Sequence, residues 1–101
     1  MPRLDQLEAF LAERPDDVFL NYARAMELSK LGRTDDAAAQ FDRVIALDGK
    51  YCPAYFQKGR TLLAAGRAGD ARAALQQGIE VAHSSGDAHA AGEMSELLAS
   101  I

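Results

Sequence analysis

Apolar side chains recur every three to four residues in the first half of the chain, which predicts two amphipathic helices. This spacing puts the apolar side chains on one face, because a helical turn takes about 3.6 residues. The first predicted helix covers residues 18–31, and the second follows a polar turn at Gly32. The two apolar stripes are Val18, Tyr22, Ala25, Leu28 and Leu31, then Ala37, Phe41, Val44, Ile45 and Leu47.

This pair of helices repeats further along the chain. Residues 32–39 (GRTDDAAA) recur 34 positions later as residues 66–73 (GRAGDARA). A fixed period of this length is typical of stacked helical units. The same offset aligns chemically similar side chains without a gap: Tyr22/Phe56, Ala25/Gly59, Leu28/Leu62, Phe41/Leu75, Ile45/Ile79 and Leu47/Val81.

Glycine and small polar residues mark the predicted helix ends. We expect Gly32 and Gly66 to adopt the left-handed conformation that ends a helix. Thr34 is expected to cap the helix that follows Gly32. By the same offset, the second unit should hold helices near 52–65 and 69–84.

Half a unit is predicted at each end. Residues 3–13 align with the second helix of a unit, and Pro15 follows as a stop signal. Asp87 can cap a last helix over 88–100. The sequence therefore predicts one all-α domain over residues 1–101, built of six antiparallel stacked helices. Its predicted parts are a half repeat at 3–13, repeats at 18–49 and 52–84, and a half repeat at 87–101.

Composition agrees with an all-α fold and narrows the choice of partners. Hydrophobic residues make up 49% of the chain, many of them alanine, whereas aromatic residues make up 7%. Alanine favours helices, and the residue types that favour strands are sparse. The net charge is −4 and there is no Lys/Arg cluster, so neither nucleic acid nor an anionic membrane is an expected partner.

Targeting signals and cysteine usage predict a cytoplasmic protein. No apolar stretch approaches the roughly 20 residues needed to span a bilayer. The first residues also lack the apolar run of a signal peptide. The single cysteine, Cys52, cannot form an internal disulfide, which fits a reducing compartment.

The 34-residue helix-turn-helix unit resembles the tetratricopeptide repeat. The family's small residue in the first helix falls on Ala25 and Gly59, and its alanine in the second helix falls on Ala37 and Ala71. The chain departs from the family at several positions. Asn21 and Tyr55 replace a tryptophan, Arg24 and Lys58 replace a leucine, and Gly78 replaces a second alanine. We expect the stems of Arg24 and Lys58 to lie on the core with their charges in water.

The resemblance implies where a partner binds. In this family the first helices line the concave side of a right-handed superhelix, and partner segments lie there. Mapped onto this sequence, that side predicts the partner-binding residues Phe19, Tyr22, Met26, Lys30, Phe56, Gln57 and Arg60, with Ala90 and Met94 of the last helix as further candidates. Phe, Tyr, Met and Arg are enriched at interfaces. The alternative is that Tyr22 and Phe56 only pack between helices.

Three features could suggest other chemistry, and each has a simpler explanation. His83 and His89 flank a Ser-Ser-Gly break, which does not align them as metal ligands. Cys52 opens a helix, where a thiolate is favoured, but a packed and idle thiol is the simpler alternative. The Gly-Arg turns lack the features of phosphate-binding loops. We expect no catalytic, metal-binding or cofactor-binding residues, and no enzyme activity.

We therefore predict a protein–protein interaction scaffold that binds a polypeptide segment. The alternative is a structural self-assembly module that forms a homodimer through its half repeats. An incomplete end unit is expected to expose an apolar stripe that another copy can cover. The predicted oligomer contacts are Leu4, Leu7, Leu11, Met94, Leu97 and Leu98.

Overall fold

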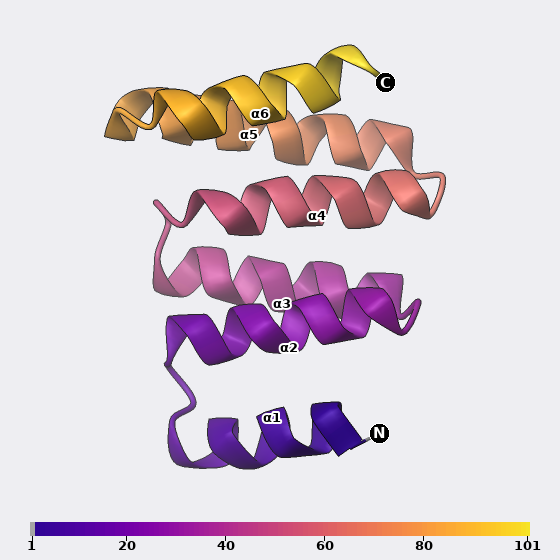
Figure 1. Ribbon diagram of the computed structural model, residues 1–101, viewed down its shortest axis with the longest axis vertical. Helices are drawn as coiled ribbons and strands as arrows, with labels where there is room; N and C mark the ends of the chain where they lie inside the picture. The colour runs from indigo at the N-terminus through magenta and orange to yellow at the C-terminus, as the bar shows by residue number, and fades with distance from the viewer. Residues whose placement is uncertain (1) are drawn as a thin grey trace.

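The helices predicted from the apolar spacing are present in the computed structural model, which describes residues 2–101. The described residues contain six helices and no strand, so the predicted all-α fold is confirmed. Figure 1 shows the helices stacked from α1 at one end to α6 at the other. Their bounds are α1 (Pro2–Glu13), α2 (Val18–Lys30), α3 (Thr34–Leu47), α4 (Cys52–Ala64), α5 (Ala68–Ser85) and α6 (Ala88–Ala99).

The contacts between helices give the stack two different sides. Each helix packs against the next one along the chain, and in addition α2 contacts α4 and α4 contacts α6. Within residues 2–101, α1, α3 and α5 make no comparable contacts with one another. The helices α2, α4 and α6 are therefore closer together than α1, α3 and α5, and the stack curves toward them. We call the side formed by α2, α4 and α6 the first-helix side.

The turns at Gly32 and Gly66 have the predicted left-handed backbone. Their φ angles are +77° and +78°. The amide that follows each glycine donates to a carbonyl of the preceding helix, from Arg33 to Leu28 O at 3.0 Å and from Arg67 to Leu62 O at 2.9 Å. This is the hydrogen bond that closes a glycine-terminated helix, and it explains why the Gly-Arg pair recurs.

The predicted cap at Thr34 is wrong. Thr34 is the first residue of α3, and the capping position belongs to Arg33, whose side chain does not cap the helix. Instead the Arg33 guanidinium donates to Asp36 Oδ2 at 2.7 and 2.9 Å. The first turn of α3 is thus stabilised by an acidic side chain near the positive helix end and by its ion pair.

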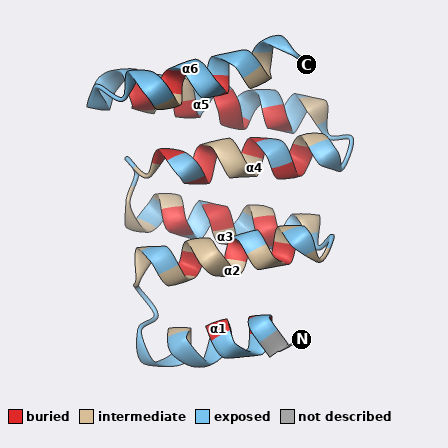
Figure 2. Cartoon of the chain, in the orientation of Figure 1, coloured by how far each residue is buried: buried red, intermediate tan, exposed pale blue. Residues whose placement is uncertain are grey.

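Two apolar clusters fill the stack. The first surrounds Phe41 and Leu28 and joins α1, α2, α3 and α4. The second surrounds Leu75 and Met94 and joins α4, α5 and α6. Ile45 packs against both clusters, so the core is continuous along the stack. Figure 2 shows the buried positions facing neighbouring helices, with exposed positions on the outer surfaces.

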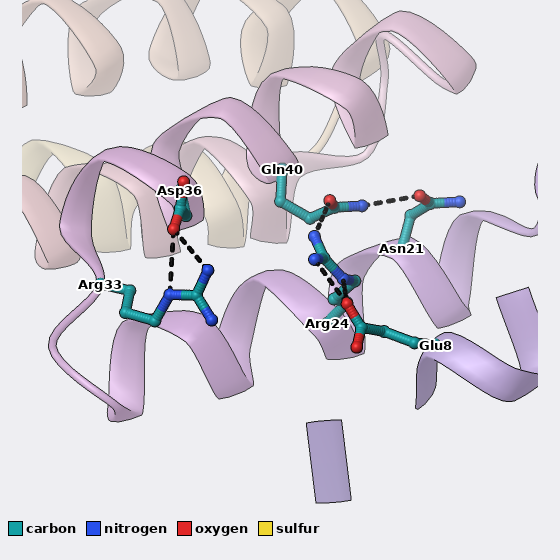
Figure 3. A network of polar contacts seen from close by, with 6 residues as sticks. All are labelled: Glu8, Asn21, Arg24, Arg33, Asp36 and Gln40. Carbon is teal, nitrogen blue, oxygen red and sulfur yellow. Dashed lines mark hydrogen bonds and ion pairs between the residues drawn. The ribbon is translucent and has the colours of Figure 1, made fainter. Parts of the chain in front are cut away.

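Arg24 and Lys58 link successive units through ion pairs. Arg24 Nη2 lies 2.8 Å from Glu8 Oε2, and Lys58 Nζ lies 2.7 Å from Asp42 Oδ1. The two pairs are related by the 34-residue repeat, and each joins a first helix to the preceding second helix. These charges are paired rather than only solvated, which corrects the expectation from sequence. Figure 3 shows the Arg24 pair.

The two residues that replace the family's tryptophan make equivalent contacts. Asn21 Nδ2 donates to Pro15 O at 3.0 Å, and the Tyr55 hydroxyl donates to Gly49 O at 2.8 Å. The two acceptors are again 34 residues apart. Asn21 also accepts from Gln40 at 2.7 Å, within the network shown in Figure 3. Each side chain therefore ties a first helix to the loop before it.

α5 is one turn longer than its counterpart. It has 18 residues, against 14 in α3. Ser84 and Ser85 continue the helix, and their hydroxyls donate to carbonyl oxygens four residues earlier at 3.0 and 2.8 Å. Gly86, at φ +76°, ends it. As a result α6 starts 36 residues after α4, from Cys52 to Ala88, instead of after 34.

Candidate functional site

Two of the predicted partner-binding residues are exposed apolar side chains on α2. Phe19 is 67% exposed and Met26 is 36% exposed. They are seven residues apart on one face, with the half-buried Ala23 between them. Phe10 on α1 is the other large exposed hydrophobic residue in the described chain. Exposed aromatic and methionine side chains on one face are typical of a binding surface.

Tyr22 belongs both to the core and to the predicted surface. Its ring meets Phe41 edge-on at 6.1 Å and Tyr51 at 5.2 Å between centroids. Burial, and then the proximity of Tyr51, raise the pKa of the Tyr22 phenol, whereas the charge of Arg60 and a hydrogen bond with Gln57 lower it. Tyr22 therefore packs between helices and also brings α2 next to Gln57 and Arg60 of α4.

Arg60 and Phe56 form a second predicted pair on α4. The Arg60 guanidinium carbon lies 5.7 Å from the centroid of the Phe56 ring, within the range of a cation–π contact. Lys30, at the end of α2, is exposed. The ion pairs seen among residues 3–101 include neither Lys30 nor Arg60. Both cations are thus free to meet an acidic group of a partner.

A hollow of about 340 Å³ lies between α4 and α6 on the first-helix side. Among the predicted partner-binding residues, Phe56 and Gln57 line this hollow. Ala90 and Met94, which the sequence also assigns to this side, line it as well. The mapping from the family pattern gave no role there to the other lining residues. The residues that the mapping missed are Cys52, Pro53, Asp87, His89 and Glu93.

A second hollow, of about 310 Å³, lies between α3, α4 and α5. Its charged residues pair with one another or with nearby groups: Lys58 with Asp42, and Arg67 with Asp70 and with Asp35. Charges that are already neutralised offer little to a charged partner. We therefore place the candidate site on the first-helix side.

Cys52 has the properties of a packed thiol. It is 5% exposed and belongs to the second apolar cluster. Burial raises the pKa of the Cys52 thiol, and the nearby Asp87 carboxylate raises it further. A raised pKa leaves less thiolate near neutral pH, so Cys52 is a weak nucleophile there.

The two histidines do not join a cluster of metal ligands. Both side chains are exposed, and His89 Nε2 lies 3.4 Å from Glu93 Oε1. Within residues 2–101, no three histidine, cysteine, aspartate or glutamate side chains gather in a way that could hold a metal ion. None of the described helices is long and apolar enough to cross a membrane.

The predicted oligomer contacts divide into buried and half-buried side chains. Leu4 and Leu7 are 5% exposed, and Met94 is 1% exposed. Leu4 belongs to the first apolar cluster of the same chain and Met94 to the second. Leu11, Leu97 and Leu98 are half-buried. The exposed stripe expected at each end is thus absent at Leu4, Leu7 and Met94, and oligomer contact at these ends stays a prediction.

Known proteins share this arrangement over most of the chain. A TPR repeat-containing protein of Pseudomonas aeruginosa is 30% identical over 95 residues, which covers 94% of this chain and 90% of that protein. The solution structure of a Bordetella parapertussis protein matches with a TM-score of 0.81 at 27% identity, covering 94% of this chain and 83% of the other. A tetratricopeptide repeat domain protein from Salinibacter ruber matches with a TM-score of 0.77 at 30% identity, covering 85% and 87%.

The family assignment rests on the sequence match as well as on the fold. Residues 28–97, more than half of the chain, match the tetratricopeptide repeat family. Proteins of this family are in general non-catalytic scaffolds for protein–protein interaction. The repeat period, the glycine turns and the stacked helical pairs agree with that match, and the chain belongs to the tetratricopeptide repeat family.

Proposed function

We propose that this chain is an interaction scaffold, and that it binds a polypeptide segment on its first-helix side. The observation that carries the proposal is the exposure of Phe19 and Met26 on α2, beside the Arg60–Phe56 pair of α4. An apolar strip with unpaired cations suits an extended or amphipathic segment that carries acidic residues. Aromatic and arginine side chains are also the commonest sources of binding energy at interfaces.

The proposal takes residues 1–101 as a single domain. Two whole repeats, 18–49 and 52–84, lie between the half repeats 3–13 and 87–101, and the continuous core supports treating them as one unit. The unpaired thiol of Cys52 fits a reducing compartment and supports a cytoplasmic location.

Binding should depend on the exposed residues of this side. Peptides selected from a random phage-displayed library on the immobilised protein supply ligands, and calorimetry then measures their Kd. We expect Phe19→Ala and Arg60→Ala each to weaken binding by about 2 kcal/mol, or about 30-fold. Both side chains are exposed, so the variants should fold normally.

Arg72→Ala is the matched control for Arg60→Ala, because Arg72 is also an exposed arginine but lies on α5, outside the first-helix side. It should leave the Kd unchanged. Equal affinity of all three variants and the wild type would contradict the proposed binding surface.

Self-association is a second candidate function, and one observation favours it. Phe10 is half exposed, whereas Val44 and Gly78, its equivalents one and two repeats later, are buried. A Cβ at Gly78 would touch both the first helix of its own unit and that of the next. By contrast, α1 contacts only one first helix, α2, within residues 2–101. A helix from a second copy could cover Phe10.

We expect light scattering to show dimers at high micromolar concentration, and Phe10→Ala to shift the protein toward monomer. Burying one phenylalanine side chain contributes about 1.5–3 kcal/mol, so the dissociation constant should rise by at least about tenfold. A wild-type protein that stays monomeric over this range would refute the dimer.

A further inference from the structure

We propose that the hollow between α4 and α6 receives an apolar side chain of the bound segment, next to a lysine or arginine of that segment. The proposal rests on the proposed function, since it names the kind of partner that the first-helix side selects. Two observations support it. The floor of the hollow is apolar, and the acidic side chains at its rim form no ion pair with a lysine or arginine of this chain.

The floor of the hollow is apolar. It is formed by Pro53 and Phe56 of α4 and by Ala90 and Met94 of α6, of which Met94 is fully buried. At about 340 Å³, the hollow lies at the small end of the range for ligand sites. That size suits a single anchoring side chain of a peptide better than a large cofactor. An aliphatic or aromatic side chain would bury apolar surface against these residues.

The rim is acidic and lacks a cation. Asp87 Oδ1 accepts from the Ala90 amide at 3.0 Å, and Glu93 faces only His89. Neither carboxylate is paired with lysine or arginine among the described ion pairs. By contrast, the acidic side chains between other helices are paired, as Glu8 is with Arg24 and Asp42 is with Lys58. The rim therefore keeps its negative charge for a partner.

The positive helix ends at this site do not cancel the negative charge of the rim. The N-termini of α4 and α6 lie at the hollow, and each contributes the equivalent of about half a positive charge. Together these partial charges are smaller than the two full negative charges of Asp87 and Glu93, and Asp87 already caps α6. The hollow thus favours a cationic group beside the apolar anchor.

The opposite charge on the rest of the first-helix side gives the segment a direction. Lys30 and Arg60 lie toward the C-terminal ends of α2 and α4, whereas Asp87 caps the start of α6 and Glu93 lies in its first half. A segment that fits both regions has its basic residue at the hollow and its acidic residues toward α2. Charge complementarity of this kind selects partners and orients them.

The test compares wild-type protein with Glu93→Lys and with the matched control Glu96→Lys. Glu96 is exposed on the same helix but does not line the hollow. Peptides selected on the wild type from a random phage-displayed library should carry lysine or arginine within two residues of a large apolar residue. Glu93→Lys should lower the affinity for these peptides by about tenfold or more, and Glu96→Lys should lower it by less than about twofold.

Peptides selected on the Glu93→Lys protein should instead carry aspartate or glutamate within two residues of the large apolar residue. If the selected peptides lose affinity in Phe19→Ala or Arg60→Ala but bind Glu93→Lys like the wild type, the charge preference of the hollow is refuted and the proposed function stands. If no peptide is enriched on the wild-type protein, both proposals fail.

Discussion

Replacing Phe41 with alanine is expected to lower the free energy of unfolding by about 3–5 kcal/mol. Phe41 is fully buried at the centre of the first apolar cluster, in contact with residues from α2 and α3. Its ring also meets Tyr22 edge-on at 6.1 Å. Removing the ring loses buried apolar area and leaves a cavity that the rigid helix pair cannot close. The free energy of unfolding of a domain of this size is about 5–15 kcal/mol in total, so little stability would remain.

Phe19→Ala removes the same atoms from an exposed position and serves as the control. Phe19 is 67% exposed, so its loss should change stability by less than about 0.5 kcal/mol. Urea titrations followed by circular dichroism measure both variants. A change below about 1 kcal/mol for Phe41→Ala would show that α2 and α3 do not pack around this ring.

Replacing Gly78 with alanine is expected to destabilise the protein by about 1–3 kcal/mol, although alanine favours helices more than glycine. A Cβ at this position would lie 2.5 Å from Met94 Sδ and 2.6 Å from Tyr55 Cβ. The methionine can move aside, but Tyr55 Cβ is fixed to the backbone of α4. The helices α4 and α5 would therefore have to separate, and the second apolar cluster would loosen.

The control is Gly92→Ala on α6. A Cβ there meets nothing within 4 Å, and Gly92 lies inside a helix. Alanine should therefore add about 0.5–1 kcal/mol of stability. Thermal and urea unfolding of the two variants should change in opposite directions. Equal stabilisation by both substitutions would show that α4 and α5 do not approach closely at Gly78.

Gly78 also shows where comparison with the family pattern misleads. The pattern has an alanine at this position, so the sequence alone suggests that Gly78→Ala is favourable. The neighbouring unit explains why glycine is needed here. Met94 Sδ of the next unit and Tyr55 Cβ both occupy the space that an alanine methyl would take. The Tyr55 contact involves Cβ, an atom that Asn21 also has at the equivalent position, so it reflects the close approach of α4 and α5. The outcome depends on two residues that lie on different helices.

The sequence by itself determined the helices and their turns, because these depend on local physics. Apolar spacing sets the buried face of each helix. The left-handed backbone at Gly32, Gly66 and Gly86 follows from the freedom of glycine. Asp87 caps α6 as predicted, through a bond to an amide three residues away. The 34-residue repeat then orders the helices, since equivalent stripes must stack in equivalent ways.

The tertiary structure alone decided which side chains are paired, buried or free. Arg24 finds its acidic partner Glu8 sixteen residues earlier, on another helix, and no local pattern specifies that contact. Leu4 and Met94 have the same apolar character as Phe19, yet only Phe19 is exposed. The hollow between α4 and α6 brings together residues 52–57 and 87–94, which lie on separate helices. Each of these features depends on contacts between distant segments, which form only when the helices have packed.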